Sequence, residues 1–187
     1  MANSDDLMRT DLQRSLRGSP IDPSKLTSFQ RILLTTDGMV TEMLEAFFWE
    51  RMTVVKLFQD DYALEHTLPA LDYERGERVL DRRIFLRGRM SHINRLYAES
   101  VIALDRLPEE VRDGLVNGQK PIGLLILENR LETFREILGC SKDPAGGLAE
   151  HFRIGSEDLL ISRVYRVIAH GQPIMLITEK FPERETA

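Results

Sequence analysis

Cysteine is almost absent from this sequence, and its scarcity narrows the chemistry. Cys140 is the only cysteine among 187 residues, which excludes an internal disulfide framework and a cysteine-based zinc site. The four histidines, His66, His92, His151 and His170, are scattered, and none has a neighbour at metal-ligand spacing. We therefore expect no metal site, and we interpret Cys140 as a small packing residue.

Long apolar runs and an excess of basic residues are lacking as well. The longest apolar stretches are far shorter than the roughly 20 residues of a membrane-spanning helix. The N-terminal stretch MANSDDLMRTDLQRSLRGSP has no apolar segment of the kind that a secretion signal needs. The formal net charge is -5, without a basic stripe or tail, so electrostatics gives no case for nucleic-acid binding. The sequence predicts a cytoplasmic domain without a membrane span.

The short motifs of nucleotide and acyl-transfer chemistry are missing. Gly146-Gly147 is the only glycine pair and belongs to a loop, and no G-x-S-x-G segment occurs. Asp60-Asp61 lies in a polar stretch, which favours a solvated turn over an acid/base pair. We expect no cofactor.

The composition and the length of the chain indicate one domain. Hydrophobic residues make up 42% and charged residues 29% of the chain, as in ordinary globular proteins, and the length suits a single core. Residues 1–25 are polar and punctuated by GSP and DPS, so we expect a loosely ordered arm with a short helix over residues 7–16. Residues 26–187 form the domain.

Helical spacing of apolar residues comes early in the domain. It predicts one helix that stops at Asp37-Gly38 and a second, capped by Asp37, with an apolar stripe from Val40 to Phe48. Pro108 followed by two acids predicts the start of a short helix. The stretch GQKPIGLLIL is ambiguous between helix and buried strand, whereas LETFREIL has the spacing of a helix.

Strand-like runs account for most of the rest. They are TVVKLF, RVLDRRIFLRGR, RLYAESVIAL, and the pair LLISRVYRVIA and IMLITEKF, which flank the turn sequence HGQP and predict a β-hairpin. Hairpin-linked strands with grouped helices favour an α+β fold with an antiparallel sheet.

Two of these strands carry a charge among apolar residues. Side chains alternate across a strand, so Glu179 shares a face with Met175 and Ile177, and Arg82 shares one with Leu80 and Ile84. One interpretation is a buried ion pair with a structural role only. The other is a pocket for a carboxylic acid, in which Arg82 binds the carboxylate and Glu179 hydrogen-bonds a hydroxyl. The residues alone leave both open.

Six segments in order give the chain a family resemblance. They are LLTTDGMVTEML, VLDRRIFLRG, YAESVIALDRLP, KPIG, SRVYR and GQPIMLITEKF. From about Leu26 to Pro182 the chain resembles the chorismate lyase superfamily, most closely its bacterial and archaeal branch. The resemblance implies a six-stranded antiparallel sheet whose helices and flaps close over an internal ligand cavity.

The resemblance also implies roles for single residues. Arg82 matches the arginine that binds the carboxylate of substrate or product, and Glu179 matches the glutamate that faces it near the ring hydroxyl. Ile122 matches a position whose backbone contacts the ligand, and Gly123 allows that close approach. Met39 matches an apolar residue on a flap over the ring. Arg163 matches a recurrent family arginine, for which the resemblance gives no place in the pocket.

The activity implied is cleavage of the small molecule chorismate to 4-hydroxybenzoate and pyruvate without a cofactor. The same superfamily includes effector-binding domains of transcription regulators, so a non-catalytic domain that binds an aromatic acid is the alternative. A longer turn, RGRMSHIN, and Lys180 depart from the family pattern and bear on which ring substituents the pocket accepts.

Overall fold

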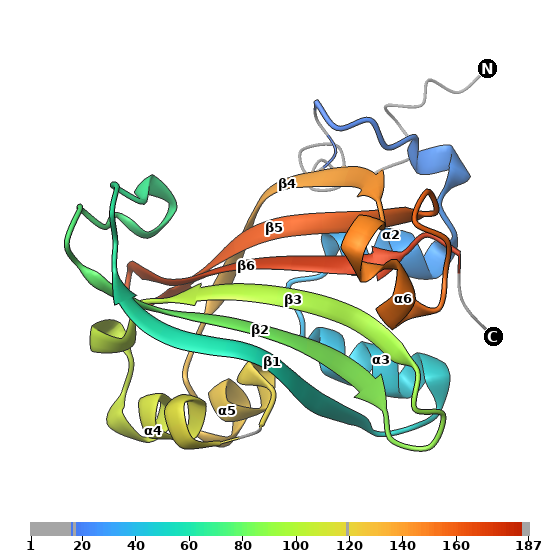
Figure 1. The fold of residues 1–187 in the computed structure, drawn as a ribbon. Coiled ribbons are helices and arrows are strands. Elements are labelled where there is room, and N and C mark those ends of the chain that lie inside the picture. Colours follow the sequence, from blue (N-terminus) through green and yellow to red (C-terminus); the bar gives the residue numbers. More distant parts are fainter. Residues whose placement is uncertain (1–15, 17, 119, 185–187) are drawn as a thin grey trace.

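Six strands pair antiparallel in the order β1-β2-β3-β6-β5-β4 (Figure 1). The computed structural model describes residues 16, 18–118 and 120–184. The strands are β1 (Met52–Ala63), β2 (Arg78–Gly88), β3 (Asn94–Ile102), β4 (Phe134–Pro144), β5 (Leu159–Ala169) and β6 (Gln172–Pro182). This sheet confirms the expected α+β fold.

The described residues also form five α-helices. They are α2 (Ser28–Thr35), α3 (Val40–Phe48), α4 (Glu109–Asn117), α5 (Ile122–Glu128) and α6 (Ala149–Phe152). Of these helices, α6 lies in front of the sheet in Figure 1 and α2 and α3 lie behind it. None of the described helices is long and apolar enough to cross a membrane.

Local sequence explains where two elements begin or turn. Thr27 and Gln30 form a capping box at the start of α2, each side chain accepting a hydrogen bond from the other residue's backbone N–H. The β5–β6 hairpin turns at His170 and Gly171, whose φ angles are 51° and 76°. Such tight hairpin turns need positive φ at both central positions, which glycine adopts without strain. The hairpin places Glu179 of β6 opposite Arg163 of β5.

Helices α2 to α5 cover one face of the sheet. The side chains on this face come from alternate positions, so Leu80, Ile84 and Leu86 of β2 pack against them. The charged member of this row, Arg82, is only 1% exposed. The burial expected from the apolar alternation in LDRRIFL is confirmed.

In the strand that carries Arg82, the alternation of the sequence also predicts a solvated opposite side with Arg83 and Phe85, and this prediction holds only in part. Arg83 is exposed there, but Phe85 is fully buried. Its ring meets Phe152 of α6 edge-on, with 5.5 Å between ring centroids. The short helix α6 thus covers the middle of this face, which the alternation of one strand cannot predict.

Two expectations about the helices were wrong. The stretch LETFREIL does not form a helix, because Phe134–Pro144 is the edge strand β4, paired with β5 along its length. Helix α3 begins at Val40 with Met39 at its N-cap and no side-chain cap, so Asp37 does not cap it. The carbonyl of Asp37 instead accepts a hydrogen bond from Arg135. Strand pairing has overridden local spacing in the first case, and in the second the loop that holds Asp37 is bonded to β4.

The structure also describes the stretch GQKPIGLLIL, which was ambiguous in the sequence, and the end of the N-terminal arm. GQKPIGLLIL contributes helix α5. In the arm, residues 1–15 and 17 lie outside the described residues, including most of the expected helix over residues 7–16. Leu16 and Ile21 are buried against Leu26 and Leu34. The described end of the arm therefore packs on the domain.

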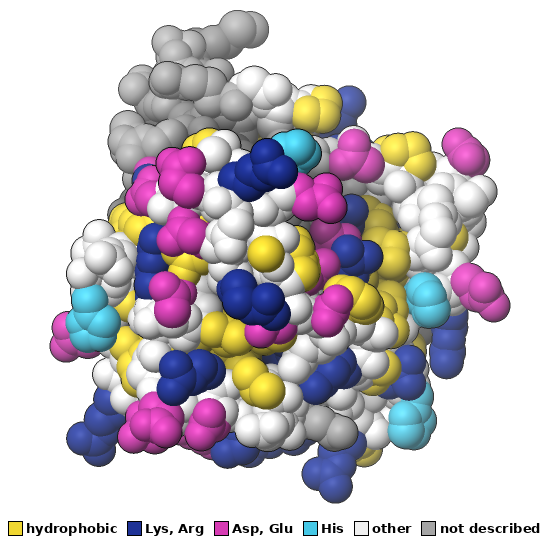
Figure 2. All heavy atoms as spheres, turned by 60° about the vertical axis from the view of Figure 1, so that its left-hand side comes forward, with side chains coloured by type: hydrophobic (Ala, Val, Ile, Leu, Met, Phe, Trp, Pro, Cys, Tyr) yellow, Lys and Arg dark blue, Asp and Glu magenta, His cyan; other side chains and the backbone are white. Residues whose placement is uncertain are grey.

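The visible surface mixes both signs of charge. Figure 2 shows basic and acidic side chains interspersed with apolar patches over one face of the molecule. This face resembles an ordinary protein surface more than the basic stripe of a nucleic-acid-binding protein.

Replacement of Phe152 by alanine is expected to lower the free energy of unfolding by about 3–5 kcal/mol, because it leaves a cavity between α6 and the sheet. Urea unfolding followed by circular dichroism measures this change in the free energy of unfolding. Phe134→Ala is the matched control, since Phe134 is 61% exposed and its loss should change stability by less than about 0.5 kcal/mol. Equal effects of the two variants would contradict the role given to α6.

Candidate active site

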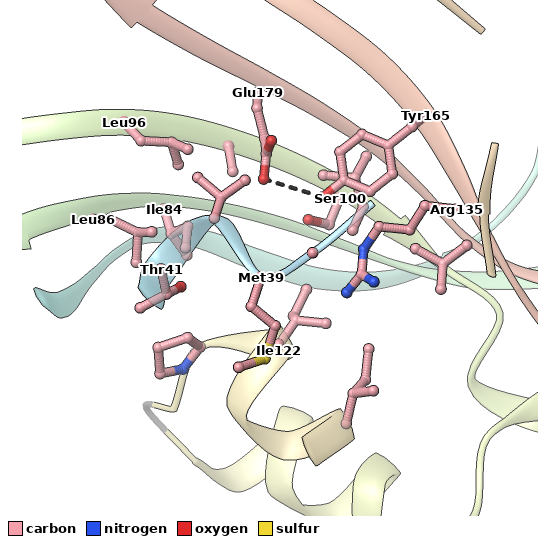
Figure 3. A pocket seen from close by; sticks show the side chains of 18 residues that line it. Met39, Thr41, Ile84, Leu86, Leu96, Ser100, Ile122, Arg135, Tyr165 and Glu179 are labelled. Atoms are coloured by element: carbon pink, nitrogen blue, oxygen red, sulfur yellow. Dashed lines mark hydrogen bonds between the residues drawn. The ribbon is translucent and has the colours of Figure 1, made fainter. Parts of the chain in front are cut away.

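A pocket opens between the sheet and the starts of helices α3 and α5. It encloses roughly 570 Å³ of space, its mouth included. Figure 3 shows side chains from both layers pointing into it. The sheet contributes Ile84, Leu86, Leu96, Ala98, Ser100, Arg135, Tyr165, Val167, Ile177 and Glu179, and the helical layer contributes Gly38, Met39, Val40, Thr41, Pro121, Ile122, Gly123 and Ile126. The lining is thus largely apolar with a few polar groups, as in many small-molecule sites.

Glu179 lies in the pocket wall and has two partners. Nε of Arg163 donates to one carboxylate oxygen at 2.8 Å, and the hydroxyl of Tyr165 donates to the other at 3.0 Å (Figure 3 shows the second bond). All three residues are buried. The carboxylate is therefore paired and oriented, as a buried charge must be.

The charge of Glu179 affects both of its partners. Burial raises the pKa of the Tyr165 hydroxyl far above its ordinary value, and the negative charge of Glu179 raises it further. Burial alone would lower the pKa of Arg163, but Glu179 together with Tyr165 and Cys140 outweighs this effect, and the pKa is raised. The arginine therefore stays a cation and the tyrosine a hydrogen-bond donor.

The ion pair between Arg82 and Glu179, one of the two interpretations left open by the sequence, is not formed. Glu179 bonds Arg163 instead, while Nη2 of Arg82 donates to the carbonyl of Lys120 at 3.1 Å. Nε and Nη1 of Arg82 are buried and meet no hydrogen-bond partner among the described residues. Burial lowers the pKa of this guanidinium. Unsatisfied donors on a buried cation are costly and call for an explanation.

Arg82 lies next to the pocket and not in its lining. It stands opposite Ser100 of β3, which does line the pocket. The carbonyl of Lys120, in the segment that leads into α5, accepts a hydrogen bond from Arg82. Pro121 and Ile122 of the same segment line the pocket, so Arg82 is bonded to a segment that borders it.

Two segments from the helical layer meet over the pocket. A Cβ atom placed on Gly123 would lie 3.2 Å from the Met39 sulfur, so glycine here lets Met39 pack against the start of α5. The sequence assigned both residues to the ligand site, and they line the pocket together with Ile122. The structure therefore gives Gly123 a packing contact with Met39, beside the approach to a ligand that the resemblance implies.

Arg163 connects the pocket wall to the loop that precedes α3. Its Nη1 donates to the carbonyl of Thr36 at 2.9 Å, and its Nη2 is buried without a partner among the described residues. The guanidinium also lies 4.8 Å from the centre of the Tyr165 ring, within the range of cation–π attraction. This arginine, which the resemblance left without a place in the pocket, is the direct partner of Glu179.

Tyr165 and Arg135 are two polar residues of the pocket lining that the sequence did not assign to the site. Tyr165 stands two positions from Arg163 on β5, so alternation along SRVYR could have placed it on the same face. Arg135 could not be placed, because its segment was interpreted as a helix. Cys140, on β4, is partly buried. Burial raises the pKa of its thiol to about 11, consistent with packing and not reactivity.

Comparison with known proteins decides the family. A family model described as chorismate pyruvate-lyase Rv2949c-like matches residues 34–186. The chain belongs to the Rv2949c-like chorismate pyruvate-lyase family. The resemblance seen in the six sequence segments is thereby confirmed.

Relatives from mycobacteria and from Methanocaldococcus jannaschii are similar to this chain over most of its length. The chorismate pyruvate-lyase of Mycobacterium tuberculosis is 35% identical over 162 residues, which is 84% of this chain and 81% of that protein. The chorismate pyruvate-lyase of Mycobacterium leprae is 32% identical over 158 residues, 84% of this chain and 75% of that one. A putative lyase of Methanocaldococcus jannaschii is 28% identical over 85% of this chain and 80% of its own length.

Solved structures share the fold of this family at low sequence identity. The effector domain of PhnF from Mycobacterium smegmatis superposes with a TM-score of 0.62 and 12% identity, over 79% of this chain and 90% of that one. The ligand-binding domain of a putative GntR-family regulator from Bordetella bronchiseptica gives a TM-score of 0.53 and 14% identity, over 73% and 89% of the two chains. At such identities the likeness concerns the fold alone.

Replacement of Arg163 by methionine is expected to destabilise the protein by about 3–5 kcal/mol, because Glu179 then remains buried without its cation. The double variant Arg163→Met/Glu179→Gln should recover much of the loss. Urea unfolding of both variants checks this.

Arg166→Met is the control for this prediction. Arg166 is also on β5 and also pairs with a glutamate, Glu136, but at a partly exposed position, where such pairs contribute about 0–1 kcal/mol. A loss in Arg163→Met no larger than in Arg166→Met would argue against a buried ion pair.

Proposed function

We propose that this chain is a chorismate–pyruvate lyase that cleaves chorismate to 4-hydroxybenzoate and pyruvate. The observation that carries the proposal is the buried guanidinium of Arg82. Two of its nitrogens lack a partner in the described protein, beside a pocket whose wall holds a buried carboxylate, Glu179. Membership of the family supports the choice of chorismate.

The reaction breaks one bond in chorismate and aromatises its ring. The C3–O bond to the enolpyruvyl group breaks, and C4 loses a proton whose bonding electrons enter the ring. The enolpyruvate that leaves takes up one proton at its methylene carbon and becomes pyruvate, so protons and electrons balance. Since aromatisation makes the reaction strongly downhill, no metal or redox cofactor is needed to drive it, and the protein's task is to bind, orient and move a proton.

Arg82 has the role of binding the ring carboxylate. A carboxylate would accept hydrogen bonds from the nitrogens that the protein leaves unpaired, and bonds of this kind between charged groups are short and strong. The segment Lys120–Gly123 has to shift for this contact, because it covers Arg82 in the present structure. The backbone of Ile122 would then contact the ligand and the apolar side chain of Met39 would lie over its ring, as the resemblance implies.

Glu179 has the role of handling the proton lost from C4. Its carboxylate is the acidic group of the pocket lining, and Arg163 and Tyr165 hold both of its oxygens in place. A base that is already oriented has no reorganisation to undergo during the reaction. After aromatisation the same carboxylate faces the new ring hydroxyl.

The runner-up is a domain that binds an aromatic acid without turnover. The fold of the GntR-type effector domains favours this alternative. Mixing purified protein with chorismate, with no metal or cofactor added, separates the two proposals. Equimolar 4-hydroxybenzoate and pyruvate by chromatography support the lyase, whereas tight binding of 4-hydroxybenzoate without turnover supports the sensor.

Arg82→Ala is expected to lower kcat/KM for chorismate by about 100-fold, since each charge-assisted hydrogen bond contributes about 1.5–3 kcal/mol. Affinity for 4-hydroxybenzoate should fall by a similar factor. Arg83→Ala is the matched control, because Arg83 is the next residue and points to the opposite, exposed face. Unchanged kinetics in Arg82→Ala would remove this arginine from the site.

Glu179→Gln is expected to lower kcat by about 10²–10⁴-fold, the usual contribution of a positioned acid or base. Binding of 4-hydroxybenzoate should change only a few-fold, since the amide keeps the shape of the side chain. The control is Glu99→Gln, because Glu99 also accepts a hydrogen bond from a tyrosine, Tyr97, but on the opposite face of the sheet. A full kcat in Glu179→Gln would assign proton transfer elsewhere.

A further inference from the structure

Arg135 is the basic residue that lines the pocket, and the reaction proposed above gives it no task. It comes from the edge strand β4 and is partly exposed. Its Nη1 donates to the carbonyl of Asp37 at 2.7 Å. Among the described residues no carboxylate pairs with it. A guanidinium has five N–H donors, and the bond to Asp37 uses one of them.

The register of the sheet attaches Arg135 and Glu179 at different levels along the strands. Arg135 stands opposite Val167 of β5, and Glu179 stands opposite Arg163 of the same strand. Four residues of a strand span about 13 Å, so the two backbone positions are roughly this far apart along the strands, while the charges of both side chains shift the pKa of Tyr165. Figure 3 shows the guanidinium of Arg135 pointing into the space between Tyr165 and Ile122.

Arg82 and Arg135 approach the pocket from different strands. Arg82 belongs to β2, and four strand spacings of about 4.8 Å separate this strand from β4. Ser100, Ile177 and Tyr165 stand between them in the row that continues from Arg82 across the sheet. Arg82 beside the pocket and Arg135 in its lining are cations on different strands, and together they suit a ligand with two separate negative charges.

We propose that Arg135 binds the second carboxylate of a dicarboxylate substrate, the one that leaves with pyruvate. The proposal rests on the proposed function, in which Arg82 takes the ring carboxylate. Chorismate has two carboxylates and 4-hydroxybenzoate has one. Arg135 therefore adds affinity for the substrate and none for the aromatic product, which favours exchange of product for substrate.

The same guanidinium couples this contact to the loop over the pocket. Asp37, whose carbonyl it binds, is two residues from Met39, which closes over the pocket beside Gly123. A carboxylate held by Arg135 thus lies between β4 and the loop. Because Arg135 is partly exposed, its contribution should weaken as salt concentration rises.

A pair of stable ligands tests the assignment without turnover. One is benzoate with a carboxymethoxy group at the meta position, and the other is benzoate with a methoxy group there, so the two differ by one carboxylate. Calorimetry on wild type, Arg135→Gln and Arg166→Gln measures their dissociation constants. Arg166 is the control, because it belongs to the neighbouring strand, pairs with Glu136 and lies outside the pocket lining.

The wild type should bind the dicarboxylate at least tenfold more tightly than the monocarboxylate. Arg135→Gln should lose this preference and keep its affinity for the monocarboxylate within about twofold, and Arg166→Gln should change neither. With chorismate, Arg135→Gln should raise KM at least tenfold and leave the inhibition constant of 4-hydroxybenzoate unchanged. Equal weakening of both ligands in Arg135→Gln, or no change in either, would overturn the proposal.

The outcomes separate this proposal from the lyase itself. A wild type that prefers the dicarboxylate through Arg135 but does not convert chorismate supports the second carboxylate site and refutes the lyase. Turnover of chorismate with an unchanged KM in Arg135→Gln supports the lyase and refutes the site. A wild type that binds neither ligand and converts nothing refutes both.

Discussion

The contact between Glu179 and Arg163 is the interaction on which the pocket depends. It joins the last two strands through a buried ion pair at 2.8 Å, and Arg163 extends the connection to the carbonyl of Thr36. Without the arginine, the carboxylate in the pocket wall would be an uncompensated buried charge, and the loop before α3 would lose an anchor. The wall, the acidic group and the cover of the pocket are therefore one connected unit.

A second arginine repeats this arrangement one strand further out. Arg135 of β4 binds the carbonyl of Asp37, next to the carbonyl that Arg163 binds. Opening of this loop would break its hydrogen bonds to both arginines. The contact of Met39 with Gly123 is apolar and contains no hydrogen bond to break. In the proposed lyase, entry of a ligand is thus linked to the two arginines on β4 and β5, and motion of this loop would be a step that can limit the release of product.

The strands that carry a charge among apolar residues were predictable, and the partners of those charges were not. Alternation in LDRRIFL and IMLITEKF gave the faces of Arg82 and Glu179, because strand period depends on local sequence alone. The choice of Arg163 over Arg82 as the partner of Glu179 depends on strand order, since β5 adjoins β6 and β2 does not. The place of Arg135 in the pocket was not predicted for a related reason. LETFREIL has helical spacing, but its pairing with β5 outweighs this local preference.

The unpaired nitrogens of Arg82 and Arg163 are the feature of the pocket that supports the proposed binding of an anion. Each buried donor without a partner costs about 1–3 kcal/mol, and more when it belongs to a charged group. A well-packed apolar side chain would avoid that cost. An anion in the pocket would offset this cost, and in the proposed function the site is oriented for negative charge before the ligand arrives. Such orientation serves a sensor and an enzyme equally. The lyase differs from the sensor in the position of Glu179, whose oriented carboxylate can take a proton as well as a hydrogen bond.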